Sequence, residues 1–165
     1  MSMRSVALSG LEDRVKIVCS DIRMYNGESV DVVVANPPYR PAWTGRVNPD
    51  PVKALARHEI SLDLDTLLGN SCMLLRPGGR IYLVYPAWRL ADLITTMRTH
   101  RIEPKTMIFV HSASGTGAEM CLVCGMKDGG KELNILSPFT VFAQQGVYTE
   151  EMEAVFRELR LPKSH

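Results

Sequence analysis

The feature of this sequence that most constrains its fold is a short apolar run, Val30–Ala35, which stops at Asn36. Valine is β-branched and favours extended backbone, so the run predicts a buried strand. Pro37 and Pro38 follow, and proline cannot donate a hydrogen bond to a sheet. The strand is therefore expected to end at Ala35, and a loop to begin at Asn36.

The residue types in this loop indicate contact with a flat ligand that carries an exocyclic amine. In an open α/β sheet, ligands gather at the carboxyl ends of the strands. The side-chain carbonyl of Asn36 can accept one N–H bond of such an amine, and the backbone carbonyl of Pro37 can accept the other. Tyr39 can stack on the ring that bears the amine, and the two prolines limit the entropy lost on binding. The alternative is a plain strand-ending turn, in which Asn-Pro and Pro-Pro are also common.

Strand and helix signals alternate along the chain, which predicts an α/β domain. The strand signals cover residues 15–19, 30–35 and 81–85, followed by a terminal antiparallel pair at 106–110 and 119–125. The helix signals cover a helix capped by Ser61 and stopped by Pro77–Gly79, residues 90–97, and a final helix capped by Thr149. A small hairpin is expected within residues 133–142.

The composition indicates one domain, residues 1–165, with 45% hydrophobic and 22% charged residues. The net charge of +1 is low for an RNA-binding protein, and the loop at residues 111–119 contains no Lys or Arg. The sequence has no apolar stretch of about 18 residues and no signal-peptide pattern, so we expect a cytoplasmic protein without membrane contact.

Two of the four cysteines, Cys121 and Cys124, have a spacing that also occurs in metal and redox sites. The nearest histidines, His100 and His111, form no ligand pattern with them. Residues three apart in a strand point to opposite faces, so both are expected to be core cysteines and no metal is expected.

The sequence Asn36-Pro37-Pro38-Tyr39 resembles the catalytic signature of class I S-adenosylmethionine-dependent methyltransferases that modify adenine N6 or glutamine N5. Residues 10–23 and 75–80 resemble segments that recur across this class. Residues 54–59 are similar to the bacterial family that methylates adenine N6 beside the anticodon of a valine tRNA, and residues 146–149 extend the resemblance over nearly the whole chain.

This resemblance implies S-adenosylmethionine as the methyl donor and tRNA as the substrate. It assigns catalysis to Asn36, Pro37, Pro38 and Tyr39, donor binding to Asp21, Ile22 and Asn36, and substrate binding to Tyr39, Arg57 and His58. A turn or helix N-cap is the alternative reading of Asp21, and the match to the motif favours donor binding. Arg40, Arg46 and Lys53 could add to a basic lip for the RNA or form a solvated helix face.

The sequence also departs from the class. It has no glycine-rich Asp/Glu-x-Gly-x-Gly-x-Gly turn and no counterpart of the first two strands. The expected fold is a Rossmann-like class I methyltransferase sheet that lacks its first two strands. We therefore expect residues 1–165 to be the C-terminal two thirds of one catalytic domain, which a separate chain or a longer product could complete. Three functions remain open: tRNA adenine-N6 methylation, protein glutamine-N5 methylation, and a chain that cannot bind the methyl donor alone.

Overall fold

The structure is a computed structural model that describes residues 2–37 and 64–159. The helices of this part are α1 (Ser2–Leu8), η1 (Ile22–Met24), α3 (Leu64–Leu74), η2 (Ala87–Arg89), α4 (Leu90–Thr99) and α5 (Glu150–Leu159). The strands are β1 (Val30–Ala35), β2 (Leu75–Pro86), β3 (Ile102–Ala113), β4 (Ala118–Lys127), β5 (Asn134–Ile135), β6 (Phe139–Gln144) and β7 (Val147–Tyr148).

The strands of the described residues form one sheet in the order β1-β2-β4-β3-β6-β7, with β5 also beside β3. β1 and β2 are parallel, whereas β4 is antiparallel to both β2 and β3. The predicted α/β class and the predicted antiparallel pair are therefore confirmed. Because β1 and β2 run in the same direction, their carboxyl ends lie at the same edge of the sheet.

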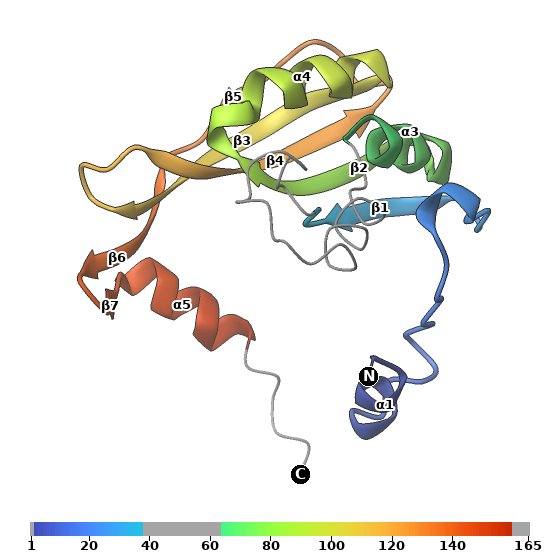
Figure 1. Cartoon of the computed structure of the whole chain (residues 1–165), viewed down its shortest axis with the longest axis horizontal. Helices are drawn as coiled ribbons and strands as arrows, with labels where there is room; N and C mark the ends of the chain where they lie inside the picture. Colours follow the sequence, from blue (N-terminus) through green and yellow to red (C-terminus); the bar gives the residue numbers. More distant parts are fainter. Residues whose placement is uncertain (1, 38–63, 160–165) are drawn as a thin grey trace, which may run out of the picture.

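Helices α3 and α4 cover one face of the sheet (Figure 1). The core lies between these helices and the strands, and consists mainly of aliphatic side chains: Leu67, Leu68, Leu75, Ile81, Leu83, Tyr85, Leu93, Met97, Ile102, Met107, Cys121 and Val123. Leu93 and Met97 lie one turn apart on α4, so the helical spacing that predicts this helix also defines its buried face.

Lys127, the last residue of β4, holds the end of α3 against the sheet. Its Nζ donates to the backbone oxygens of Cys72 and Leu75, both at 2.6 Å. The last carbonyls of a helix have no partner within the helix, and a lysine here satisfies two acceptors at the junction of α3 and β2.

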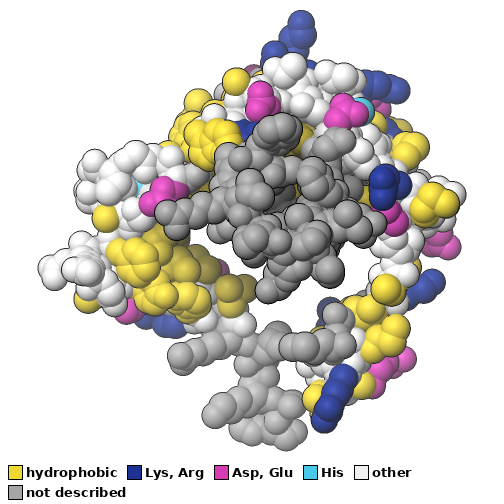
Figure 2. Space-filling model, viewed as in Figure 1, with side chains coloured by type: hydrophobic (Ala, Val, Ile, Leu, Met, Phe, Trp, Pro, Cys, Tyr) yellow, Lys and Arg dark blue, Asp and Glu magenta, His cyan; other side chains and the backbone are white. Residues whose placement is uncertain are grey.

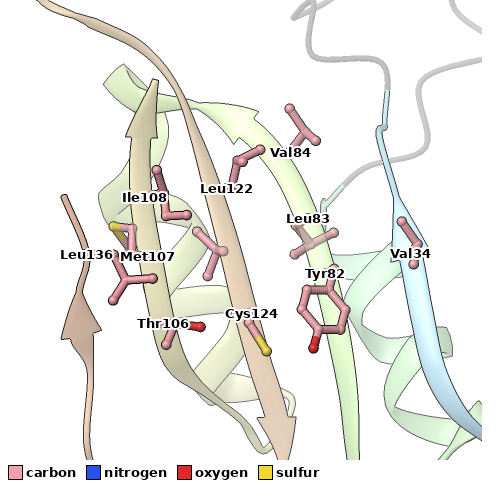
Figure 3. A pocket seen from close by; sticks show the side chains of 11 residues that line it. Val34, Tyr82, Leu83, Val84, Thr106, Met107, Ile108, Leu122, Cys124 and Leu136 are labelled. Carbon is pink, nitrogen blue, oxygen red and sulfur yellow. The ribbon is translucent and has the colours of Figure 1, made fainter. Parts of the chain in front are cut away.

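The other face of the sheet is not covered by α3 or α4, and α1 and α5 lie away from it on that side (Figure 1). Apolar side chains from four strands and the segment after β5 line a hollow of about 260 Å³ on this face (Figure 3). Val34 of β1 is 77% exposed here. The prediction of a buried strand at 30–35 is therefore wrong, because β1 packs through one face only, although its boundaries are confirmed.

Helix α5 packs on the β6–β7 hairpin through aromatic rings. Phe142 stacks on Tyr148 at 5.1 Å between ring centroids, and Tyr148 meets Phe156 edge to face at 5.2 Å. Figure 2 shows hydrophobic side chains gathered over this part of the molecule. The predicted cap is confirmed, since Thr149 Oγ1 accepts a hydrogen bond from Met152 N at 3.2 Å.

Two predicted elements are absent from the structure. Residues 15–19 form no strand, because in the described residues β1 has a strand, β2, on one side only and nothing pairs with 15–19. The hairpin expected within 133–142 is also wrong: β5 and β6 each pair in parallel with β3. The hairpin is instead formed by β6 and β7, with a turn at Gly146, whose φ of 77° suits glycine.

The junction between α3 and β2 lies earlier than predicted. The helix ends at Leu74 and β2 begins at Leu75, so Pro77–Gly79 lie inside the strand and not at the end of the helix. Val30 pairs with Leu75 and Val32 pairs with Arg80, which leaves an irregular segment on β2 that accommodates the proline. The predicted cap Ser61 lies outside the described residues.

Candidate active site

The candidate site lies at the edge where β1 and β2 both end. Asn36 and Pro37 directly follow β1, and Ala35 pairs with Leu83 of β2. Continuing this register by two residues sets Pro37 opposite Tyr85. Asn36 is exposed and Pro37 is buried. The proline ring therefore anchors the backbone while the neighbouring amide side chain reaches the surface, which is the arrangement the proposed amine contact needs.

Beside this point, the segment after β2 carries an exposed indole and a guanidinium held against rings. Trp88, in η2, is 72% exposed. The guanidinium carbon of Arg89 lies 5.5 Å from the ring centroid of Tyr85 and 5.8 Å from that of Trp88. Arg89 Nε donates to Asp92 Oδ2 at 3.2 Å. The sequence analysis missed this cluster, although a Trp-Arg pair directly after the strand-ending Pro86 was a usable signal.

Tyr85 does not supply a base at this edge. Burial raises the pKa of its phenol above the ordinary value of 10.0, and the nearby Arg89 charge only partly opposes this shift. The phenol is therefore protonated at neutral pH. This agrees with a site that orients an amine through hydrogen-bond acceptors and has no need of a side chain with an unusual pKa.

The β3–β4 hairpin borders the same edge. Met120 pairs with Pro86 across β4 and β2, so the tip of the hairpin extends past the end of β2. His111 Nδ1 donates to the backbone oxygen of Thr116 at 2.7 Å, and Thr116 Oγ1 donates to that of Ala113 at 2.7 Å. These bonds give the tip a defined conformation.

Asp21 and Ile22 lie at the other end of β1. Asp21 caps η1: its Oδ1 accepts from the backbone nitrogen of Arg23 at 2.9 Å, and its carboxylate forms an ion pair with the Arg23 side chain. The Arg23 hydrogen bonds lower the pKa of Asp21 to about 2. The N-cap reading of Asp21 is therefore confirmed.

The contacts of η1 show that Asp21 and Ile22 lie near the start of β1. Arg23 lines a groove with Cys72 and Met73, just before Leu75, the residue that pairs with Val30 at the start of β1. Ile22 packs against the core. At a rise of about 3.3 Å per residue, β1 separates this end from Asn36 by roughly 20 Å. The structure thus does not bring Asp21 and Ile22 to Asn36, and their role in donor binding remains a prediction.

The other predicted site residues lie outside the described residues: Pro38, Tyr39, Arg57 and His58, together with the basic residues Arg40, Arg46 and Lys53.

The two cysteines of the Cys-x-x-Cys pair are buried and form no disulfide. Cys121 belongs to the core on the helix-covered face, and Cys124 lines the hollow on the other face. Burial raises the pKa of Cys121 to about 11. Within residues 2–37 and 64–159, no group of three or more His, Cys, Asp or Glu side chains is placed to hold a metal ion. Every helix in these ranges is too short or too polar to cross a bilayer.

Comparison with known proteins shows what this chain is similar to. It is 28% identical over 159 residues to the tRNA1(Val) (adenine(37)-N6)-methyltransferase of Phocaeicola vulgatus, an alignment that covers 95% of this chain and 66% of that protein. It is 43% identical over 90 residues to the protein of the same name from Aeromonas salmonicida, covering 54% of this chain and 37% of the relative. No family model matches the chain.

Among solved structures, a predicted O-methyltransferase from Agrobacterium tumefaciens superimposes with a TM-score of 0.71 at 15% identity, covering 94% of this chain and 70% of that one. These comparisons confirm the predicted resemblance to adenine-N6 methyltransferases and the methyltransferase type of fold. The chain spans about two thirds of the length of the Phocaeicola relative and just over a third of the Aeromonas one.

Proposed function

We propose that this chain acts in S-adenosylmethionine-dependent methylation of an adenine N6 in tRNA, with Asn36 and Pro37 as the residues that hold the amine. The observation that carries this proposal is the placement of an exposed Asn36 and a buried Pro37 at the carboxyl end of β1. Relatives named as tRNA adenine-N6 methyltransferases support it independently.

The chemical problem is the low nucleophilicity of an amine conjugated with an aromatic ring. The Asn36 side-chain oxygen accepts one amine hydrogen, and the Pro37 backbone carbonyl accepts the other. Both acceptors gain strength as positive charge develops on the nitrogen, so they stabilise the transition state more than the bound substrate. Burial of the Pro37 ring fixes the position of one acceptor before substrate binds.

S-adenosylmethionine would supply an electrophilic methyl group on a sulfonium. Asn36 would contact both the donor and the substrate. In this structure Asp21 and Ile22 lie at the opposite end of β1 from Asn36. The Asp21 carboxylate forms an ion pair with the Arg23 side chain. We propose that Asp21 and Ile22 contact the donor when residues 15–19 pair beside β1, since a parallel strand there would end at the Asn36 edge.

The target adenine must be flipped out of the RNA stack, because base pairing would make its amine inaccessible. Tyr39 would stack on that base, and Arg57 and His58 would contact the RNA.

We further propose that additional polypeptide completes the donor site. This polypeptide is equivalent to the part of the relatives that this chain does not match, and a separate chain or a longer product supplies it. The unmatched third of the Phocaeicola relative and the apolar face of the sheet that no helix of residues 2–37 and 64–159 covers support this view. Such an enzyme would work in the cytoplasm, where tRNA is available.

The test is transfer of a radiolabelled methyl group from S-adenosylmethionine to two acceptors offered in parallel, a valine tRNA and a glutamine-containing peptide. The chain is assayed alone and with the unmatched part of a relative added as a separate polypeptide. Label in the tRNA only is expected. Label in the peptide only would replace the proposal with glutamine-N5 methylation, and label in neither acceptor under both conditions would refute it.

A further inference from the structure

The cluster of the exposed Trp88 and the partly buried Arg89 has no role in the function proposed above, although it lies beside the candidate site. The cluster follows Pro86 at the end of β2, and β2 is the parallel neighbour of the strand that ends at Asn36. An indole that is 72% exposed contributes little to the core, since most of its apolar surface stays in water. Its location at the substrate edge matters more than its packing.

Arg89 is held in one orientation before any ligand binds. The rings of Tyr85 and Trp88 lie within 5.8 Å of its guanidinium carbon, and the Nε bond to Asp92 fixes the plane of the group. Within the described residues, the terminal nitrogens Nη1 and Nη2 have no hydrogen-bond partner. A guanidinium fixed in this way can form a paired contact with a phosphate and loses little conformational entropy on binding.

A flat exposed ring beside an oriented cation matches the chemistry of single-stranded nucleic acid. Each nucleotide offers a base face for stacking and a phosphate for charge pairing, and proteins that bind unpaired strands combine these two contacts. A protein with a net charge of +1 cannot rely on a broad positive field, so local contacts of this kind must supply the affinity.

We propose that Trp88 and Arg89 form a binding site for an unpaired nucleotide of the RNA substrate, adjacent to the base held at Asn36. Trp88 stacks on the base of this nucleotide and Arg89 binds a phosphate next to it. This inference rests on the proposed function for the identity of the substrate, but it concerns residues that the motif does not include. It assigns them to RNA binding and positioning, and not to the methyl-transfer step.

The experiment measures binding of a fluorescein-labelled RNA stem-loop, with an unpaired adenosine in its loop, to the chain and its variants across a series of salt concentrations. Trp88→Ala is expected to raise Kd about 10-fold, whereas Trp88→Phe keeps a stacking face and stays within about 3-fold of the unchanged chain. Arg89→Gln is expected to weaken binding and to lower the slope of log Kd against log salt by about 0.7–0.9, the value for one lost phosphate contact.

Two residues near the start of β2, at the other end of this strand from Trp88, provide matched control variants. Arg76 is also an exposed arginine in an ion pair, with Asp31, so Arg76→Gln removes the same charge far from the proposed site. Met73 is 70% exposed on α3, so Met73→Ala removes a comparable apolar side chain. Neither variant is expected to change Kd or the salt slope. The melting temperature of each variant is recorded, and because Trp88 is exposed, Trp88→Ala is expected to fold as stably as the unchanged chain.

The outcomes separate this inference from the proposed function. RNA binding that depends on Trp88 and Arg89, without methyl transfer to the RNA, would support the inference and contradict the function. Methyl transfer with unchanged binding in Trp88→Ala and Arg89→Gln would overturn the inference alone. Failure of the unchanged chain to bind the RNA, or an equal effect of the Arg76→Gln control, would also overturn it.

Discussion

At the scale of single residues, the proposed function divides the work between two neighbouring residues. Pro37 is buried and fixes the backbone, while Asn36 is exposed and presents its amide. An acceptor that is already in place costs no reorganisation when charge develops on the attacking nitrogen, which is the main advantage of preorganised electrostatics.

Replacing Asn36 by alanine tests this division of work. Asn36→Ala removes one acceptor of the amine, so kcat for methyl transfer should fall by about 10²–10³-fold, while the Kd for RNA should change little. Single-turnover methylation and the fluorescence binding assay measure the two quantities separately. A loss confined to RNA affinity would show that Asn36 contacts the substrate without assisting transfer.

The ion pair between Asp21 and Arg23 is expected to depend on pH. Hydrogen bonds from Arg23 lower the pKa of Asp21 from 3.8 to about 2. Because the folded-state pKa is depressed, the contribution of the pair is fully present above about pH 3.8 and is lost as the pH falls through about 2. Carboxyl NMR of Asp21 should show this low midpoint, and Arg23→Gln should return it toward the ordinary value. An unchanged midpoint in Arg23→Gln would show that Arg23 does not cause the shift.

At the scale of elements, the approach of α4 to β4 leaves little space for a side chain on β4. A Cβ on Gly125 would lie 2.4 Å from Met97 Cε and 2.6 Å from Ile102 Cγ2. Glycine is therefore required here by space and not by backbone conformation. This contact joins the helix layer to the centre of the sheet, between the strands that hold the candidate site and the rest of the molecule.

Adding one methyl group at this contact should destabilise the protein. Gly125→Ala is expected to lower the free energy of unfolding by about 1–3 kcal/mol, the usual cost of overpacking. Gly117→Ala is the control: nothing lies within 4 Å of a Cβ at Gly117, so a change within about 0.5 kcal/mol is expected. Urea denaturation measures both, and equal stability of the two variants would contradict the packing account.

The elements also show what the sequence could and could not predict. The local sequence pattern identified α4 through its helical spacing and the β3–β4 pair through two strand signals. It failed for residues 15–19, since a strand exists only where another strand pairs with it, and no local pattern reports that partner. It placed the end of α3 too late, because Pro77 and Gly79 signal a break that the structure accommodates as an irregular segment of β2.

The candidate site was predictable where its residues form a motif. The position of Asn36 after β1 is confirmed, whereas the cluster of Tyr85, Trp88 and Arg89 depends on how η2 folds back over the end of β2. That contact joins a strand to a helical turn, and spacing in the sequence alone does not define it.

At the scale of the whole molecule, the dominant feature is a sheet that α3 and α4 cover on one face only (Figure 1). Val34, Tyr82 and Leu136, which line the hollow on the other side, are 77%, 43% and 42% exposed. Contiguous apolar surface of this kind usually marks an interface with other polypeptide. It is therefore consistent with a chain that spans only part of its relatives' length.

The exposed apolar side chains on this face of the described sheet should bind a hydrophobic dye in the native state. Val34→Thr removes apolar surface from this face, so anilinonaphthalene sulfonate fluorescence should fall while the melting temperature stays unchanged. Val33→Thr is the matched control on the packed face of the same strand, and there the hydroxyl should lower stability by about 1–2 kcal/mol. Dye binding that does not respond to Val34→Thr would place the exposed surface elsewhere.

The central claim is that the methyl group reaches an exocyclic adenine nitrogen. Mass spectrometry of nucleosides from a valine tRNA treated with the chain, S-adenosylmethionine and the unmatched part of a relative tests this claim directly. The account predicts N6-methyladenosine, with the signal lost in Asn36→Ala. Methylation of a ring nitrogen, no methylated adenosine, or N6-methyladenosine that persists in Asn36→Ala would contradict it.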